Sequence, residues 1–103
     1  MINEIKIIGK IAGEIKNISK TENPMVIFSV VTWDGVGENK KSEFHQVVCF
    51  AKSAEFLIKH AKPKDQVFVS GRVEYVKLDN GMKAQIKADK IRMLGAKNEE
   101  SVA

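Results

Sequence analysis

The segment EFHQVVCFAKSAEFLIKHA, residues 43–61, passes from a strand-like pattern directly into a helix-like one. Its first ten residues alternate with period two, which is typical of a strand, yet both faces carry apolar side chains. From Lys52 to Ala61 apolar residues recur at helical spacing, and Ser53 is the candidate N-cap. This is the one helix that the sequence predicts, and its position decides the fold.

Strand-like alternation also covers residues 2–13, 25–33, 66–78 and 82–94. Between the last two, Asp79-Asn80-Gly81 is a strong signal for a tight hairpin turn. Five strands with one helix between the third and the fourth are the element order of an OB-fold. We therefore predict an all-β, five-stranded OB-fold barrel with one short helix.

Length and composition favour a single globular domain. The chain has 103 residues, of which 44% are hydrophobic and 29% charged. No apolar run approaches the roughly 18 residues of a membrane span, and no secretory signal precedes the first strand. We assign residues 1–95 to the OB-fold domain and 96–103 to a short polar tail, and we expect a cytoplasmic location. Gly9 suggests a bulge or sharp coil in the first strand, and both Gly9 and Gly71 fall inside long strands, where a small barrel must coil tightly.

The residues that carry most enzyme chemistry are sparse. The single cysteine, Cys49, excludes an internal disulfide and a thiolate metal cluster. The two histidines, His45 and His60, lie on different predicted elements and fit no nucleophile or metal-ligand spacing. We expect no catalytic site, no metal and no cofactor.

Basic residues outnumber acidic ones. Seventeen Lys and Arg face 13 Asp and Glu, which gives a formal net charge of +4. Fifteen of the 17 are lysine, a residue better suited to non-specific phosphate contact than to bidentate reading of bases. The charge balance thus favours a polyanionic partner.

The aromatic residues of two strands can share an outer face. If Val47 and Cys49 point into the barrel with His45, the alternate residues Phe44, Gln46, Val48 and Phe50 line the outside. An inward pair of Phe28 and Val30 likewise turns Ser29, Val31 and Trp33 outward. Exposed rings near lysines suit sequence-tolerant stacking of unpaired bases. The alternatives are that the phenylalanines fill the core and that the lysines are ordinary solvated surface.

Phe44 and Phe50 lie six residues apart in the predicted strand. At roughly 3.3 Å per residue this is about 20 Å, so the two rings would engage different bases.

Six segments in this order resemble the bacterial single-stranded DNA-binding protein family. They are MINEIKIIGKI, VIFSVVT, EFHQVVCFAKSAEF, KDQVFVSGRV, the DNG turn and QIKADKIRMLG, and the resemblance runs from Met1 to about Gly95. It implies an OB-fold homotetramer whose DNA crosses the face with Phe44, Gln46 and Phe50. Lys52 matches a family lysine that contacts phosphate, and His45 matches a histidine near the subunit contact.

The chain departs from the family pattern in three regions. Trp33 follows Thr32 directly, whereas the family often has a tryptophan four residues after this threonine. Leu78 occupies a position that is commonly aromatic. The last residues, 99–103, also lack the acidic tip with a terminal aromatic that recruits replication and repair proteins, so we do not expect such recruitment. This ending would suit a phage or mobile-element copy, or a primosome accessory protein.

The sequence predicts sequence-independent binding and protection of single-stranded DNA in replication, recombination or repair, by a homotetramer or a homodimer. A replication-restart accessory OB-fold and an OB module that binds a protein partner are the alternatives. The predicted DNA-binding residues are Trp33, Phe44, Gln46 and Phe50 on the outer face, with Lys10, Lys40, Lys41, Lys52, Arg72, Lys77 and Lys83 as phosphate partners.

Overall fold

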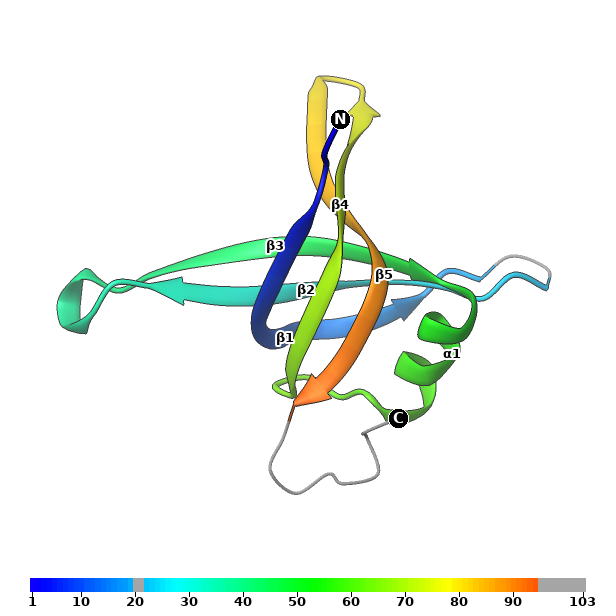
Figure 1. Ribbon diagram of the computed structural model, residues 1–103, viewed down its shortest axis with the longest axis horizontal. Coiled ribbons are helices and arrows are strands. Elements are labelled where there is room, and N and C mark those ends of the chain that lie inside the picture. The colour runs from blue at the N-terminus through cyan, green and yellow to red at the C-terminus, as the bar shows by residue number, and fades with distance from the viewer. Residues whose placement is uncertain (20–21, 95–103) are drawn as a thin grey trace.

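Five strands close into a barrel with one helix beside it (Figure 1). The structure, a computed structural model, describes residues 1–19 and 22–94. Neighbouring strands follow the order β1-β2-β3-β5-β4, and β4 pairs with β1 to complete the barrel. This confirms the predicted OB-fold and the place of its helix. The elements are β1 Ile5–Asn17, β2 Met25–Asp34, the 3-10 helix η1 Gly37–Asn39, β3 Lys41–Phe50, α1 Ala51–His60, β4 Gln66–Leu78 and β5 Gly81–Leu94.

The core is built from the inward-facing residues of every strand and from one face of α1. Val47 and Cys49 of β3 are fully buried, as the alternation predicts, and so are Phe28 and Val30 of β2. Leu57 of α1 covers one side of this cluster. No polar or charged side chain is buried in the part of the chain that the structure describes. The barrel interior is therefore held together by apolar packing.

Two residues of the outer face are less accessible than the alternation suggested. Val31 and Val48 point away from the core cluster, but their side chains are only 8% and 1% exposed to solvent. Val31 lies between Lys10 and Phe44 in the sheet, and Val48 lies between Ile27 and Lys87. A short valine between longer side chains is shielded from solvent, so these two residues are not available for contact.

The start of α1 differs from its prediction. The helix begins at Ala51, one residue earlier than expected, with Phe50 at the N-cap and no side-chain capping bond. Ser53 is therefore not the cap. The strand runs straight into the helix because Ala51 takes a left-handed conformation with φ 58° and its N–H donates to the Pro24 carbonyl at 3.1 Å.

Gly9 and Gly71 lie where strands approach each other closely. A Cβ atom at Gly71 would lie 2.2 Å from the Lys87 carbonyl oxygen, and one at Gly9 would lie 2.3 Å from that of Val31. The register between β4 and β5 shifts between Ser70 and Gly71, whereas the irregularity in β1 falls after Gly9, between Ala12 and Lys16. Beyond this irregularity β1 pairs with β2 again, which extends the strand past its predicted end.

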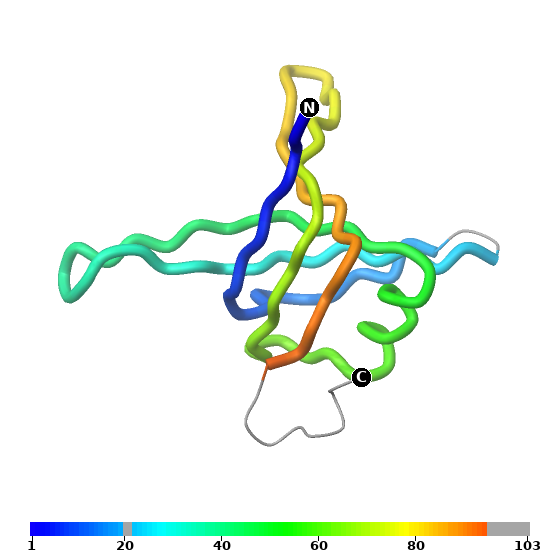
Figure 2. The backbone as a smooth tube through the Cα atoms, in the orientation of Figure 1, coloured from blue at the N-terminus to red at the C-terminus, as the bar shows by residue number. Residues whose placement is uncertain are grey.

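Two hairpin arms project from the barrel in different directions (Figures 1 and 2). The β2–β3 arm ends at η1. The β4–β5 arm ends at a two-residue turn, since Leu78 pairs with Gly81, and this confirms the predicted hairpin. The N-terminal segment runs beside the β4–β5 arm, where the Asn3 side chain exchanges two hydrogen bonds, at 2.9 and 3.0 Å, with the Val73 backbone.

Cys49 is expected to resist alkylation in the folded protein. Burial raises the pKa of its thiol to about 12, and the thiolate is the reactive form. Iodoacetamide at pH 8 should leave the native protein unmodified and should add one group per chain in denaturant, as mass spectrometry would show. Rapid modification of the native protein would contradict the buried position.

Candidate nucleic-acid interface

The aromatic residues predicted on the outer face lie outside the barrel. The β2–β3 register pairs Val31 with Phe44 and Met25 with Phe50, and it places Trp33 on the same face. Trp33, Phe44 and Phe50 are 46%, 67% and 38% exposed. The alternative in which these rings fill the core is therefore wrong. We call this outer surface of β2 and β3, with the adjoining residues of β5, the aromatic face.

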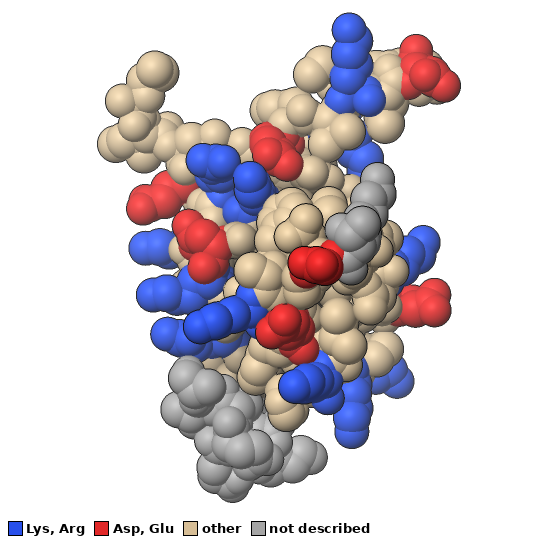
Figure 3. Space-filling view, turned by 90° about the vertical axis from the view of Figure 1, so that its right-hand side faces the viewer, with Lys and Arg blue, Asp and Glu red and all other residues tan. Residues whose placement is uncertain are grey.

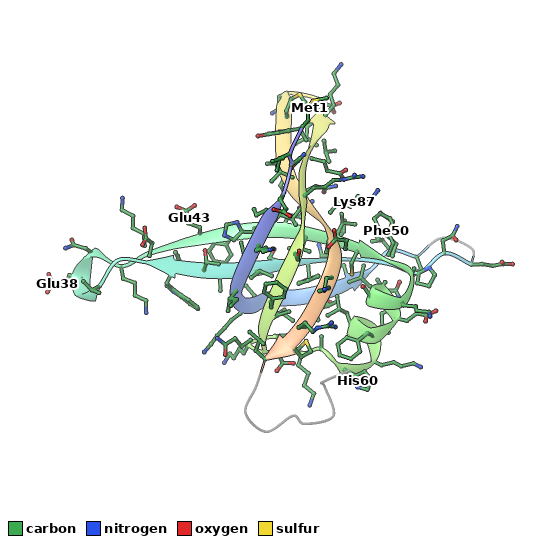
Figure 4. All side chains as sticks on the ribbon, viewed as in Figure 1. Met1, Glu38, Glu43, Phe50, His60 and Lys87 are labelled. Atoms are coloured by element: carbon green, nitrogen blue, oxygen red, sulfur yellow. The ribbon has the colours of Figure 1, made fainter. Side chains whose placement is uncertain are left out.

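Two of these rings carry a lysine ammonium group above them. The Lys40 Nζ atom lies 5.2 Å from the centre of the Trp33 ring, and the Lys87 Nζ atom lies 5.3 Å from that of Phe50. Figure 4 shows Phe50 and Lys87 side by side. Both distances are within the range of a cation–π interaction. Each pair sets a flat apolar surface next to a positive charge.

Lys87 was not predicted as a site residue. It meets the aromatic face because β5 pairs with β3 in parallel, with Lys87 opposite Val48. The sequence gives no local signal for this pairing, since the two strands are far apart in the chain. Only the strand order of the OB-fold, in which β5 lies beside β3, brings Lys87 to this face.

Several predicted basic residues adjoin the aromatic face. Lys10 pairs with Val31 and so lies one strand away from Phe44. Arg72 pairs with Lys87, and Lys83 lines a cavity with Phe44.

Other predicted basic residues lie elsewhere. Lys52 is exposed in the first turn of α1, two positions after Phe50. Lys41 pairs with Asp34, and because side chains alternate along a strand, this pair lies on the side opposite Trp33. On the β4–β5 arm, Lys77 and Lys83 likewise point to opposite faces, because Lys83 pairs with Val76 rather than with Lys77. The structure does not bring Lys41 and Lys77 to the aromatic face.

Gln46 lies at the edge of a cavity between β3 and β5. Its Nε2 atom donates to Gln85 Oε1 at 2.8 Å, and Gln85 Nε2 donates to Glu74 Oε2 at 2.8 Å. The cavity has a volume of about 260 Å³, and Phe44 and Lys83 contribute to its wall. The outer face thus combines a stacking surface, positive charge and amide groups at one place.

The histidines have local partners. His45 is half-buried, and its Nε2 atom lies 2.9 Å from Thr32 Oγ1. His60 lies in the last turn of α1, with its ring 5.0 Å from that of Phe56. Among residues 1–19 and 22–94, no group of three or more potential metal ligands is found. The expectation that the chain has no catalytic site stays a prediction.

Charge is distributed over the surface rather than confined to one patch. Figure 3 shows Lys and Arg side chains along both edges of one face, with Asp and Glu between them. Local placement of lysines beside rings is therefore more informative than the net charge.

A closed five-stranded barrel with its helix between β3 and β4 defines an OB-fold, a class whose β2–β3 face and loops bind oligonucleotides or oligosaccharides. Residues 2–94 match the single-strand binding protein family. The chain belongs to this family.

Two similar proteins illustrate the relationship. The chain is 29% identical over 80 residues to a single-stranded DNA-binding protein of Mycoplasma pneumoniae (strain ATCC 29342 / M129 / Subtype 1), an alignment that covers 77% of this chain and 48% of that protein. The chain thus spans about half the length of this curated relative. Its fold is similar to that of the Plasmodium falciparum SSB solved in complex with ssDNA, with a TM-score of 0.77 and 18% identity, over 92% of this chain and 96% of that one.

No helix in the described part of the chain is long and apolar enough to cross a membrane.

Proposed function

We propose that this protein coats single-stranded DNA without strong sequence preference and performs no bond chemistry. The observation that carries this proposal is the aromatic face, on which Trp33, Phe44 and Phe50 are all exposed. Membership of the single-strand binding protein family supports it. The setting is the replication, recombination or repair of DNA, in the cytoplasm of the cell.

The proposed mechanism combines stacking with phosphate contact. Every base has a π face, so a strand of any sequence stacks on exposed rings, at about 1–3 kcal/mol per base. Lys40 and Lys87, which lie over Trp33 and Phe50, are positioned to meet the phosphates beside the stacked bases. The remaining proposed partners are Lys10, Lys52, Arg72 and Lys83, with Lys41 and Lys77 as contacts of a strand that wraps around the arms.

We further propose that the protein acts as a homo-oligomer, with a tetramer as the family would suggest. Support comes from apolar side chains on the β4–β5 arm and the segment beside it. Tyr75 and Met82 are 66% and 63% exposed, and Ile2 is 90% exposed. A small domain gains stability when such surface is covered by another copy.

Oligo(dT) is expected to quench the emission of Trp33, the single tryptophan. Stacking brings a base onto the ring, and log affinity should fall with log salt at a slope of about −0.7 for each phosphate contact. A titration at low and high salt measures both, with duplex DNA of the same length as the comparison. Unchanged emission and no affinity for oligo(dT) would favour an OB module that binds a protein partner.

A further inference from the structure

The contact between β3 and β5 is short and is continued by side chains. The two strands pair as parallel strands at Val47 with Ile86 and at Val48 with Lys87. At the next outward-facing position, the hydrogen bond between Gln46 and Gln85 bridges the strands. We call the chain Gln46–Gln85–Glu74 the amide relay.

The amide relay has a fixed direction. Ionised Glu74 only accepts hydrogen bonds, so Gln85 must turn its NH₂ group toward this carboxylate. The Gln85 oxygen then faces Gln46, which must also present its NH₂ group. Of the residues that the structure describes, none donates to the remaining Gln46 Oε1 atom, and this atom is not buried. The relay therefore leaves one oriented acceptor open.

The acceptor lies at a cavity whose size and lining suit a nucleobase. Gln46 and Gln85 line the cavity between β3 and β5, together with the exposed ring of Phe44 and the side chain of Lys83. The rest of the wall is apolar apart from two polar side chains, Ser29 and His45. At about 260 Å³ the cavity is smaller than the roughly 300–1,000 Å³ of drug-sized sites. It suits one flat ring with apolar faces and a polar edge.

We propose that the amide relay recognises the unpaired state of a base. In this inference, which rests on the proposed function, one base of the bound strand enters the cavity beside Phe44, and Gln46 Oε1 accepts a hydrogen bond from an N–H on its Watson–Crick edge. All four bases carry such an N–H, so the site tolerates any sequence. In a duplex that N–H is already paired. Gln85 and Glu74 are positioning residues, because they act only through Gln46.

The competing interpretation is that the relay only joins β3 to β5. In that case its variants lower stability but do not change how the protein responds to a blocked base edge. The test therefore measures a ratio of affinities for two oligonucleotides. The probes are oligo(dT) and an oligomer of equal length in which every base is N3-methylthymine, which keeps the ring and removes the N–H.

The wild-type protein is expected to bind the methylated oligomer about 2- to 12-fold more weakly, the range of one net hydrogen bond. Gln46→Leu should bring the ratio close to one. Glu74→Gln should also lower the ratio, since a neutral amide no longer fixes the direction of the relay. Gln66→Leu is the matched control, because Gln66 is exposed on β4 outside the cavity, and it should keep the wild-type ratio.

Each result of this experiment decides the inference. Equal wild-type affinity for the two oligomers would overturn it while leaving the proposed function in place. A wild-type ratio in folded Gln46→Leu would overturn it as well, and Glu74→Gln carries the test should Gln46→Leu fail to fold. No binding of either oligomer would instead remove the proposed function, and the inference with it.

Discussion

Replacing Phe44 and Phe50 together with alanine is expected to weaken binding to oligo(dT) by about 2–6 kcal/mol, from about 30-fold to more than 10⁴-fold. Each ring is exposed and should stack one base at about 1–3 kcal/mol. The two effects should add, because six residues of strand separate the rings by about 20 Å. Fluorescence anisotropy of a labelled oligomer, at one fixed salt concentration, measures the loss.

The matched control for this double variant is Ile58→Ala. Ile58 is an apolar residue with 45% exposure, comparable to Phe50, but it lies on α1 rather than on the aromatic face. Its replacement should leave affinity unchanged. Wild-type affinity in a folded Phe44→Ala/Phe50→Ala protein would contradict stacking, and an equal loss in the control would show that the effect is not local.

Phe28→Ala is expected to lower the free energy of unfolding by about 3–5 kcal/mol, the usual range for a buried phenylalanine. The Phe28 side chain is only 2% exposed to solvent and belongs to the barrel core. Since small domains are stable by only about 5–15 kcal/mol, this single change should remove a large share of the total. Urea denaturation followed by circular dichroism measures the change.

Phe44→Ala provides the comparison for Phe28→Ala, because it deletes the same atoms from an exposed site. Its unfolding free energy should stay within about 0.5 kcal/mol of the wild type, while its affinity for oligo(dT) falls. The two phenylalanines thus separate stability from binding. Similar destabilisation by both variants would mean that Phe44 is packed rather than exposed.

Much of the barrel could be predicted because alternation along a strand is a local property. The parity of Phe28 and Val30, and of Val47 and Cys49, follows from the period of two, and each of these residues is buried. The helix position then selects the OB-fold among small barrels. Ser53 failed as an N-cap because the strand and the helix are joined through the backbone of Ala51, a tertiary arrangement that capping statistics do not include.

The candidate site was less predictable because it depends on pairing between distant strands. Trp33, Phe44 and Phe50 could be placed on one face from the sequence alone, and the structure agrees. Lys87 and Gln85 reach this face because β5 pairs in parallel with β3, and this pairing has no local signature in the sequence. Glu74 joins them through the antiparallel pairing of β4 with β5. Lys77 and Lys83 were both predicted as phosphate partners, and the hairpin register places them on opposite faces of the β4–β5 arm.

The absence of buried polar or charged side chains from the described barrel has a further consequence. Ionic strength acts mainly on charges that face water, and in this molecule those charges lie on the outside of a hydrocarbon interior. Affinity for a polyanion and stability of the barrel should therefore depend on different interactions. We therefore expect a rise in salt to weaken the proposed contact with single-stranded DNA while the barrel stays folded.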